Sequence, residues 1–184
     1  MIENAMNIEL LDFEADQHLL LLRQWMVEPH VSRWWGNPES NLLELSQRNQ
    51  DTQAIIGVDG KPVGYLCWQT PSQEELLEAG LSDLPGDIVD VDIMIGEVDA
   101  LGKGVGPKAL RSLFERLKSR GVSLVGLAGA IANDRAMVAY KKAGLIPFRD
   151  FFECGEQYRY FTISLSELAK QDAPADGLVP TAEL

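Results

Sequence analysis

Apolar residues recur along the chain with two different spacings, which predict strands in some segments and helices in others. Strands are expected where apolar residues alternate with polar ones or form short runs, at residues 7–12, 53–58, 63–69, 87–96, 122–128, 145–153 and 156–165. Helices are expected where apolar residues return every three or four positions, at residues 16–27, 40–49, 72–79, 105–120 and 133–143. The aromatic segment at residues 30–36 is predicted as a loop or short turn.

The order of these elements predicts the fold class. Strand, helices, hairpin, strand, helix, strand, helix and hairpin follow one another, which is typical of an α/β or α+β domain with a mixed sheet. Asp59-Gly60 lies between two apolar runs and predicts a tight hairpin, because both turn residues must tolerate a positive φ. We expect one domain over residues 1–168 and a flexible tail over residues 169–184, which are rich in Pro, Ala and acids.

Composition narrows the class of protein. Of the 184 residues, 46% are apolar, which argues against disorder across most of the chain. The longest apolar runs fall well short of the ~20 residues that a membrane span needs, and the N-terminus lacks the pattern of a secretion signal. The two cysteines, Cys67 and Cys154, are too few for a disulfide framework. We therefore expect a cytoplasmic protein with no membrane partner.

Charge is distributed unevenly along the chain. The 28 acidic and 16 basic residues give a net charge of −12, which disfavours nucleic acid as a partner because phosphate contacts need clustered Lys and Arg. Residues 100–145 reverse this balance, with nine basic residues and two acidic ones. One part of the protein could therefore bind an anion and another a cation, although charged helix surfaces are often only solvated. With two histidines and no Cys cluster, no metal site is expected.

A glycine-rich segment joins the strand at residues 87–96 to the helix that starts at residue 105. It reads Leu101-Gly102-Lys103-Gly104-Val105-Gly106. Glycines let a backbone approach a ligand closely, and a helix N-terminus favours a phosphate. The spacing matches neither the dinucleotide fingerprint GxGxxG nor the GxxxxGK loop of nucleoside-triphosphate binders. Glycines at such a turn can also be purely structural.

Together with a second motif, this turn resembles the GCN5-related N-acetyltransferase (GNAT) family. The second motif, at residues 133–145, reads NDRAMVAYKKAGL. The resemblance implies the GNAT fold, a mixed and mostly antiparallel sheet of about seven strands flanked by helices. It also implies acetyl-CoA as co-substrate, with the diphosphate at the turn and backbone donors on a splayed fourth strand. The cofactor residues implied are Met94, Ile95, Leu101, Gly102, Lys103, Gly104, Val105, Gly106, Asn133 and Tyr140.

Within the family, the chain looks most like the aminoglycoside 6′-N-acetyltransferases. The matching residues are His30, Val31, Trp34, Trp35, Gly36, Gly64, Tyr65, Asp92 and the turn with Leu101. The acid that this branch carries at the end of the fifth strand falls on Ala128 here. A related class, which acylates hydroxylamines of siderophore precursors, also uses an early His and Trp-rich segment, and therefore stays as an alternative.

The candidate chemistry is attack of an amine on a thioester. Asp90 and Asp92 share one strand face, about 6.6 Å apart by the rise per residue, and two acids there would attract a cationic amine; a solvent-facing strand edge is the alternative. Asp92, which matches the acid of the branch, would bind the ammonium or take its proton. The resemblance makes Tyr140 the candidate general acid, although helical aromatics often belong to a core.

Three tryptophans are candidates for the wall of a substrate cleft. Trp34, Trp35 and Trp68 could stack on a sugar or a cation, or they could equally be core residues. We therefore expect an acetyl-CoA-dependent N-acetyltransferase, a monomer or homodimer, that acts on a small cationic amine by direct attack in a ternary complex, with aminoglycosides favoured. The alternatives are the hydroxylamine acyltransferase and a non-catalytic acyl-CoA-binding module.

Overall fold

The structure is a computed structural model that describes residues 6–153, 155–166 and 168. Its described part contains seven strands in one sheet, in the order β1-β2-β3-β4-β5-β7-β6. The strands are β1 (Ile8–Asp12), β2 (Gln53–Val58), β3 (Lys61–Gln69), β4 (Val89–Ile95), β5 (Leu124–Ala130), β6 (Ile146–Glu153) and β7 (Glu156–Ser164). The helices are α1 (Ala15–Met26), α2 (Pro29–Trp35), α3 (Pro38–Gln47), α4 (Gln73–Glu78), α5 (Val105–Ser119) and α6 (Asp134–Ala143). The predicted tail at 169–184 lies outside the described residues.

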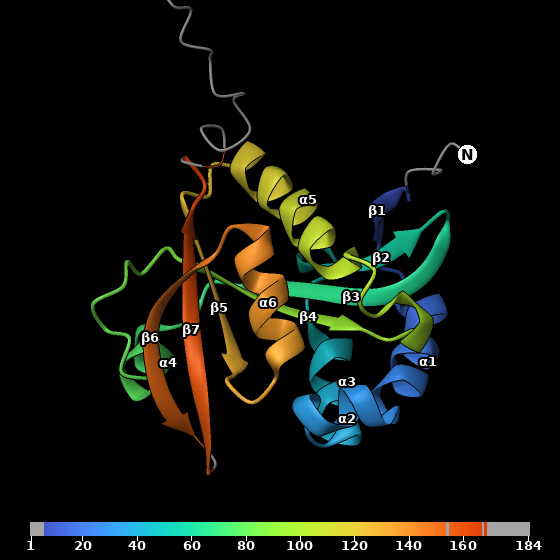
Figure 1. The fold of residues 1–184 in the computed structure, drawn as a ribbon, viewed down its shortest axis with the longest axis horizontal. Coiled ribbons are helices and arrows are strands. Elements are labelled where there is room, and N and C mark those ends of the chain that lie inside the picture. The colour runs from blue at the N-terminus through green and yellow to red at the C-terminus, as the bar shows by residue number, and fades with distance from the viewer. Residues whose placement is uncertain (1–5, 154, 167, 169–184) are drawn as a thin grey trace, which may run out of the picture.

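Helices cover both faces of the sheet (Figure 1). One apolar core packs α5 and α6 against one face, and its members include Phe114, Leu127 and Phe161. A second core packs α1, α2 and α3 against the opposite face of β2, β3 and β4. The side chains of Leu66 and Tyr65 belong to different cores, as expected where neighbouring residues of a strand point to opposite faces. The predicted mixed, mostly antiparallel sheet flanked by helices is therefore confirmed.

The fourth and fifth strands separate soon after they begin. Their parallel pairing covers only Val89 with Val125 and the next residue pair, and Figure 1 shows β4 and β5 diverging beyond that point. The amide of Gly96 donates to the carbonyl of Val63 on β3, at 2.8 Å. Because successive amides of a strand point to opposite sides, the amide of Ile95 faces the gap between β4 and β5. This gap is the space in which the candidate site lies.

One segment differs from its prediction. Residues 30–36 do not form a loop or turn, because residues 29–35 form the helix α2. Pro29 occupies the first turn of this helix, where its fixed φ is favourable and its missing N–H is not needed. Gly36 ends it with a φ of +72°. A seven-residue helix lacks enough turns for apolar spacing to reveal it, and α2 is stabilised by packing on the sheet.

Candidate active site

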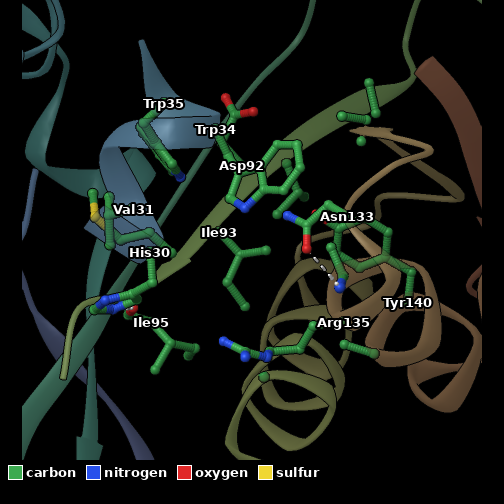
Figure 2. Close-up of a pocket in the computed structure, with 18 of the residues that line it drawn as sticks. His30, Val31, Trp34, Trp35, Asp92, Ile93, Ile95, Asn133, Arg135 and Tyr140 are labelled. Carbon is green, nitrogen blue, oxygen red and sulfur yellow. Dashed lines mark hydrogen bonds between the residues drawn. The ribbon is translucent and has the colours of Figure 1, made fainter. Parts of the chain in front are cut away.

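A cleft of about 310 Å³ opens where β4 and β5 separate. α2 borders it on one side and α6 on the other, with β4 between them (Figure 2). Nine of the fifteen candidate coenzyme, substrate and catalytic residues line this cleft: Trp34, Trp35, Asp92, Met94, Ile95, Leu101, Gly106, Asn133 and Tyr140. The predicted coenzyme residues Gly102, Lys103, Gly104 and Val105 do not line it. Segments that are far apart in the chain thus meet around one cavity.

The helix α2 brings aromatic side chains to the cleft. Trp34 and Trp35 both line it and are half-buried. The Trp35 ring packs edge-to-face against Tyr65 of β3, with 6.4 Å between ring centroids. His30 holds the same helix to β4, since its Nε2 lies 3.1 Å from the carbonyl oxygen of Ile95. The tryptophans are therefore placed by a helix that is anchored to the end of β4.

Asp92 is a carboxylate that β4 contributes to the cleft. It is accessible to solvent there. Burial raises the pKa of Asp92 above its ordinary value, and the positive charge of Arg48 opposes that rise. The Sγ of Cys67, opposite Asp92 on β3, lies 3.9 Å from its Oδ2. A carboxylate with a raised pKa is a better base near neutral pH than an ordinary aspartate.

Two predicted substrate residues, Asp90 and Trp68, do not line the cleft. Asp90 accepts a hydrogen bond from the hydroxyl of Tyr160, next to Gly126, where a Cβ would collide with the Tyr160 hydroxyl. Burial raises the pKa of Asp90 to about 6, although this hydrogen bond opposes the rise. Trp68 is 5% exposed and belongs to the core that packs against α5. Both side chains therefore have contacts within the fold in place of the predicted substrate contacts.

The glycine-rich turn leads directly into α5. Gly102 and Gly104 have φ angles of +73° and +77°, and Gly104 is the N-cap of the helix. Among the described residues, no backbone carbonyl accepts a hydrogen bond from the amides of residues 102–106. Five consecutive N–H groups at a helix N-terminus are thus left for a ligand, and such groups favour an anion. Lys103 is exposed beside them, whereas Val105 is buried in the core. This cradle fits a diphosphate.

The helix α6 supplies Asn133 and Tyr140. Asn133 caps the helix, because its Oδ1 accepts a hydrogen bond from the amide of Ala136 at 3.2 Å (Figure 2). Tyr140 is 8% exposed and packs edge-to-face on Phe161, with 5.6 Å between ring centroids. Burial raises the pKa of Tyr140, so the phenol keeps its proton at neutral pH. Tyr140 is therefore a core aromatic whose protonated phenol also lines the cleft.

Arg135, Glu153 and Tyr158 also line the cleft, and the sequence did not single them out. Figure 2 shows Arg135 extending from α6 toward the side of β4. Because Arg135 lies inside the motif at residues 133–145, it could have been selected as a candidate site residue from the sequence. Glu153 and Tyr158 come from β6 and β7, and only the pairing of these strands beside β5 brings them here. No local pattern marks them.

Two other classes of site have no support in the described part of the chain. No group of three or more His, Cys, Asp or Glu residues there is arranged to hold a metal ion. No helix there has the length and apolar character needed to cross a membrane. The thiol of Cys67 is free and buried, whereas Cys154 lies outside the described residues.

Comparison with known proteins identifies relatives along most of the chain. The family model described as "Acetyltransferase (GNAT) domain" matches residues 14–151. Aminoglycoside N(6′)-acetyltransferase type 1 proteins of Klebsiella pneumoniae and Serratia marcescens are each 25% identical over 162 residues, which cover 78% of this chain and 77% of the relative.

Solved structures share the same fold. The crystal structure of aminoglycoside acetyltransferase AAC(6′)-Ib with coenzyme A and kanamycin is 20% identical, with a TM-score of 0.70 over 92% of this chain and 100% of the other. A Bacillus halodurans protein of 17% identity reaches a TM-score of 0.74 over 90% of this chain and 88% of its own. These likenesses confirm the fold that the two motifs implied.

Proposed function

The chain belongs to the GNAT acetyltransferase family, and we propose that it transfers an acetyl group from acetyl-CoA to a primary amine of a small polycation of the aminoglycoside class. The observation that carries the choice of acceptor is the position of Asp92, a carboxylate in the cleft between the tryptophans of α2 and Tyr140 of α6. The names of the curated relatives favour the 6′-amine of an aminoglycoside.

The coenzyme side of the cleft is built mainly from backbone groups. The unpaired amides of residues 102–106, with the ammonium of Lys103 beside them, would bind the diphosphate of acetyl-CoA. Asn133 lies at the start of α6, where it would meet the pantetheine arm. The amide of Ile95, which faces the gap, would donate to the thioester oxygen as that oxygen gains negative charge.

The chain's own side chains would carry the proton transfers. Asp92 takes a proton from the substrate ammonium, so that the neutral amine can form the C–N bond while the C–S bond breaks. Tyr140, whose phenol is protonated at neutral pH, donates its proton to the departing sulfur. The acetylated nitrogen then loses a second proton as it becomes an amide. This proton replaces the one that Tyr140 gave to the sulfur, so the reaction releases one proton in total.

The acceptor side of the cleft suits a molecule with several positive charges. Glu153 lines the cleft from β6, in addition to Asp92 from β4, so two carboxylates on separate strands are available to two ammonium groups. The rings of Trp34 and Trp35 offer apolar faces on which sugars or cations stack. Glu153 thus supplies an acid to the cleft that Ala128 also lines, although Glu153 pairs with Glu156 and Ala128 pairs with Tyr160 farther along β7.

The hydroxylamine acyltransferase is the second candidate. Ala128 lines the cleft and carries no charge, which favours an acceptor with less positive charge on that side. The two candidates differ in the protonation of their acceptors, because an alkylamine is an ammonium at neutral pH and a hydroxylamine is not.

Release of free CoA tests the proposal. The purified protein with acetyl-CoA is assayed with kanamycin and with O-methylhydroxylamine, and mass spectrometry locates the acetyl group on any product. We expect CoA release with kanamycin, well above hydrolysis, and acetylation of its 6′-amine. Release with the alkoxyamine alone would favour the hydroxylamine candidate. If acetyl-CoA binds but neither acceptor causes CoA release, the result would favour a non-catalytic acyl-CoA-binding module.

A further inference from the structure

A second, smaller chamber lies behind Asp92. Its volume is about 130 Å³, and it is lined by Trp35, Asn41, Glu44, Leu45, Arg48, Cys67 and Asp92. We call it the rear chamber. Asp92 and Trp35 line both this chamber and the cleft. The carboxylate of Asp92 is therefore reached from two sides, one facing the substrates and one facing α3.

The lining of the rear chamber is polar enough to hold water. The guanidinium of Arg48 forms an ion pair with Glu44 at 2.7 Å, and its side chain is 13% exposed. The Nε of Arg48 is buried and has no hydrogen-bond partner among the described residues. A buried donor without a protein partner is normally satisfied by an ordered water, and the chamber has room for several.

The rear chamber reaches the protein surface on the α3 side. The side chain of Glu44 is 62% exposed, so the carboxylate that pairs with Arg48 is also in contact with bulk solvent. This opening lies at α3, whereas the glycine-rich turn of the coenzyme side belongs to α5. Substrates that fill the cleft would leave it open.

The proposed reaction releases one proton for each alkylammonium that is acetylated. Asp92 takes that proton and becomes a neutral carboxylic acid, which must lose it before the next turnover. With acceptor and coenzyme in the cleft, the cleft side of Asp92 is covered. Cys67 does not offer a way out, because it is fully buried and its pKa is raised to about 12 by burial.

We propose that the rear chamber is the route by which the proton taken by Asp92 leaves the active site. This inference rests on the proposed function. Asp92 passes the proton to a water in the chamber, which restores the carboxylate and forms a hydronium. Neighbouring waters beside Asn41 and Arg48 carry the charge to Glu44 and on to bulk solvent.

Assays with two acceptors distinguish a role of the rear chamber in proton release from a purely structural role. Kanamycin presents ammonium groups and needs a proton removed, whereas O-methylhydroxylamine is already neutral and does not. Asn41→Leu keeps the number and branching of the side-chain heavy atoms and removes a polar group from the chamber wall. Glu44→Gln removes the charge at the chamber mouth. Glu39→Gln is the matched control, since Glu39 is an exposed residue of the same helix outside the chamber.

We expect Asn41→Leu and Glu44→Gln each to lower kcat for kanamycin by about tenfold, because Asp92 must lose its proton before the next turnover. The rate with O-methylhydroxylamine and the affinity for acetyl-CoA should stay within about twofold of wild type, because neither requires removal of that proton. Equal losses with both acceptors would overturn the proposal, since Asn41 also donates a hydrogen bond to the carbonyl of Trp35. Unchanged kinetics with kanamycin in both variants would overturn it as well. Wild-type protein that acetylates neither acceptor would instead refute the proposed function.

Discussion

The two sides of the cleft differ in whether backbone groups or side chains face the ligand. The proposed coenzyme side uses consecutive backbone amides at the start of α5, where Gly102 and Gly104 have positive φ angles. The acceptor side presents side chains from α2, β4 and β6. A backbone cradle fits a group common to all reactions of a family, whereas a set of side chains can change with the acceptor. The coenzyme side should therefore control affinity for acetyl-CoA, and the acceptor side should control turnover and choice of amine.

The largest effect is expected on the acceptor side. Asp92→Asn removes the proposed base and should lower kcat/KM for kanamycin by about 10²- to 10³-fold, while the affinity for acetyl-CoA stays unchanged. Steady-state kinetics and calorimetry measure the two quantities.

Asp90→Asn is the matched control, on the same strand and the same face. The amide still accepts from Tyr160, and the substitution removes a buried carboxylate whose pKa is raised to about 6. Its kinetics should stay within about twofold of wild type, as expected for a residue outside the reacting groups. A loss as large as that of Asp92→Asn would show that the two acids act together and that the placement of Asp90 away from the chemistry is wrong.

Tyr140→Phe should give the next largest effect. It removes the proposed proton donor for the sulfur and keeps the aromatic packing on Phe161, so kcat should fall by about 10- to 100-fold with little change in Tm. Tyr160→Phe supplies the contrast, since it leaves the buried carboxylate of Asp90 without its donor. That variant should lose about 1 to 3 kcal/mol of unfolding free energy and keep its turnover. Full activity of Tyr140→Phe would remove Tyr140 from the reaction.

The same contrast explains what the sequence could predict. The coenzyme side is encoded by residues that are close in the sequence: a strand, a glycine turn and an amphipathic helix follow one another. Its motif at residues 101–106 could therefore be recognised from the sequence. Asp92 could be selected as a candidate from the sequence because it interrupts an apolar strand, and it lines the cleft. Glu153 and Tyr158 could not be selected in this way, because strand pairing decides their position. The contacts of Asp90 and Trp68 within the fold could not be predicted, because the alternation of a strand gives two faces and does not say which neighbours cover each part of a face.

A pair of glycines at the two ends of α5 tests the coenzyme side. Gly104 and Gly121 have φ angles of +77° and +85°, and a Cβ at either position would meet nothing within 4 Å. An alanine at either one therefore introduces similar backbone strain, about 1 to 2 kcal/mol. Only Gly104→Ala should weaken acetyl-CoA binding, by about tenfold, because relief of the strain turns the amides away from the diphosphate. Calorimetry measures the affinity of each variant for acetyl-CoA, and thermal unfolding measures the loss of stability caused by the backbone strain. Equal affinities would contradict the backbone cradle.

The smallest effect concerns the charge that links the cleft to the rear chamber. Asp92 must be ionised to act as a base, so activity should fall as the pH is lowered through its pKa, which burial raises. The positive charge of Arg48 opposes that rise. Arg48→Gln should therefore raise the pKa of Asp92 further and move the acid limb of the kcat/KM profile to higher pH.

The profiles of wild type and Arg48→Gln should differ by several-fold at the acid end and converge at alkaline pH, where Asp92 is ionised in both. Glu44 has the opposite influence, because its negative charge raises the pKa of Asp92, so Glu44→Gln should not move the limb upward. A uniform loss at every pH in Arg48→Gln would mean that Arg48 only supports the packing of α3. A limb that moves to lower pH would contradict the sign of the interaction, and with it the role of Asp92 as the group that titrates.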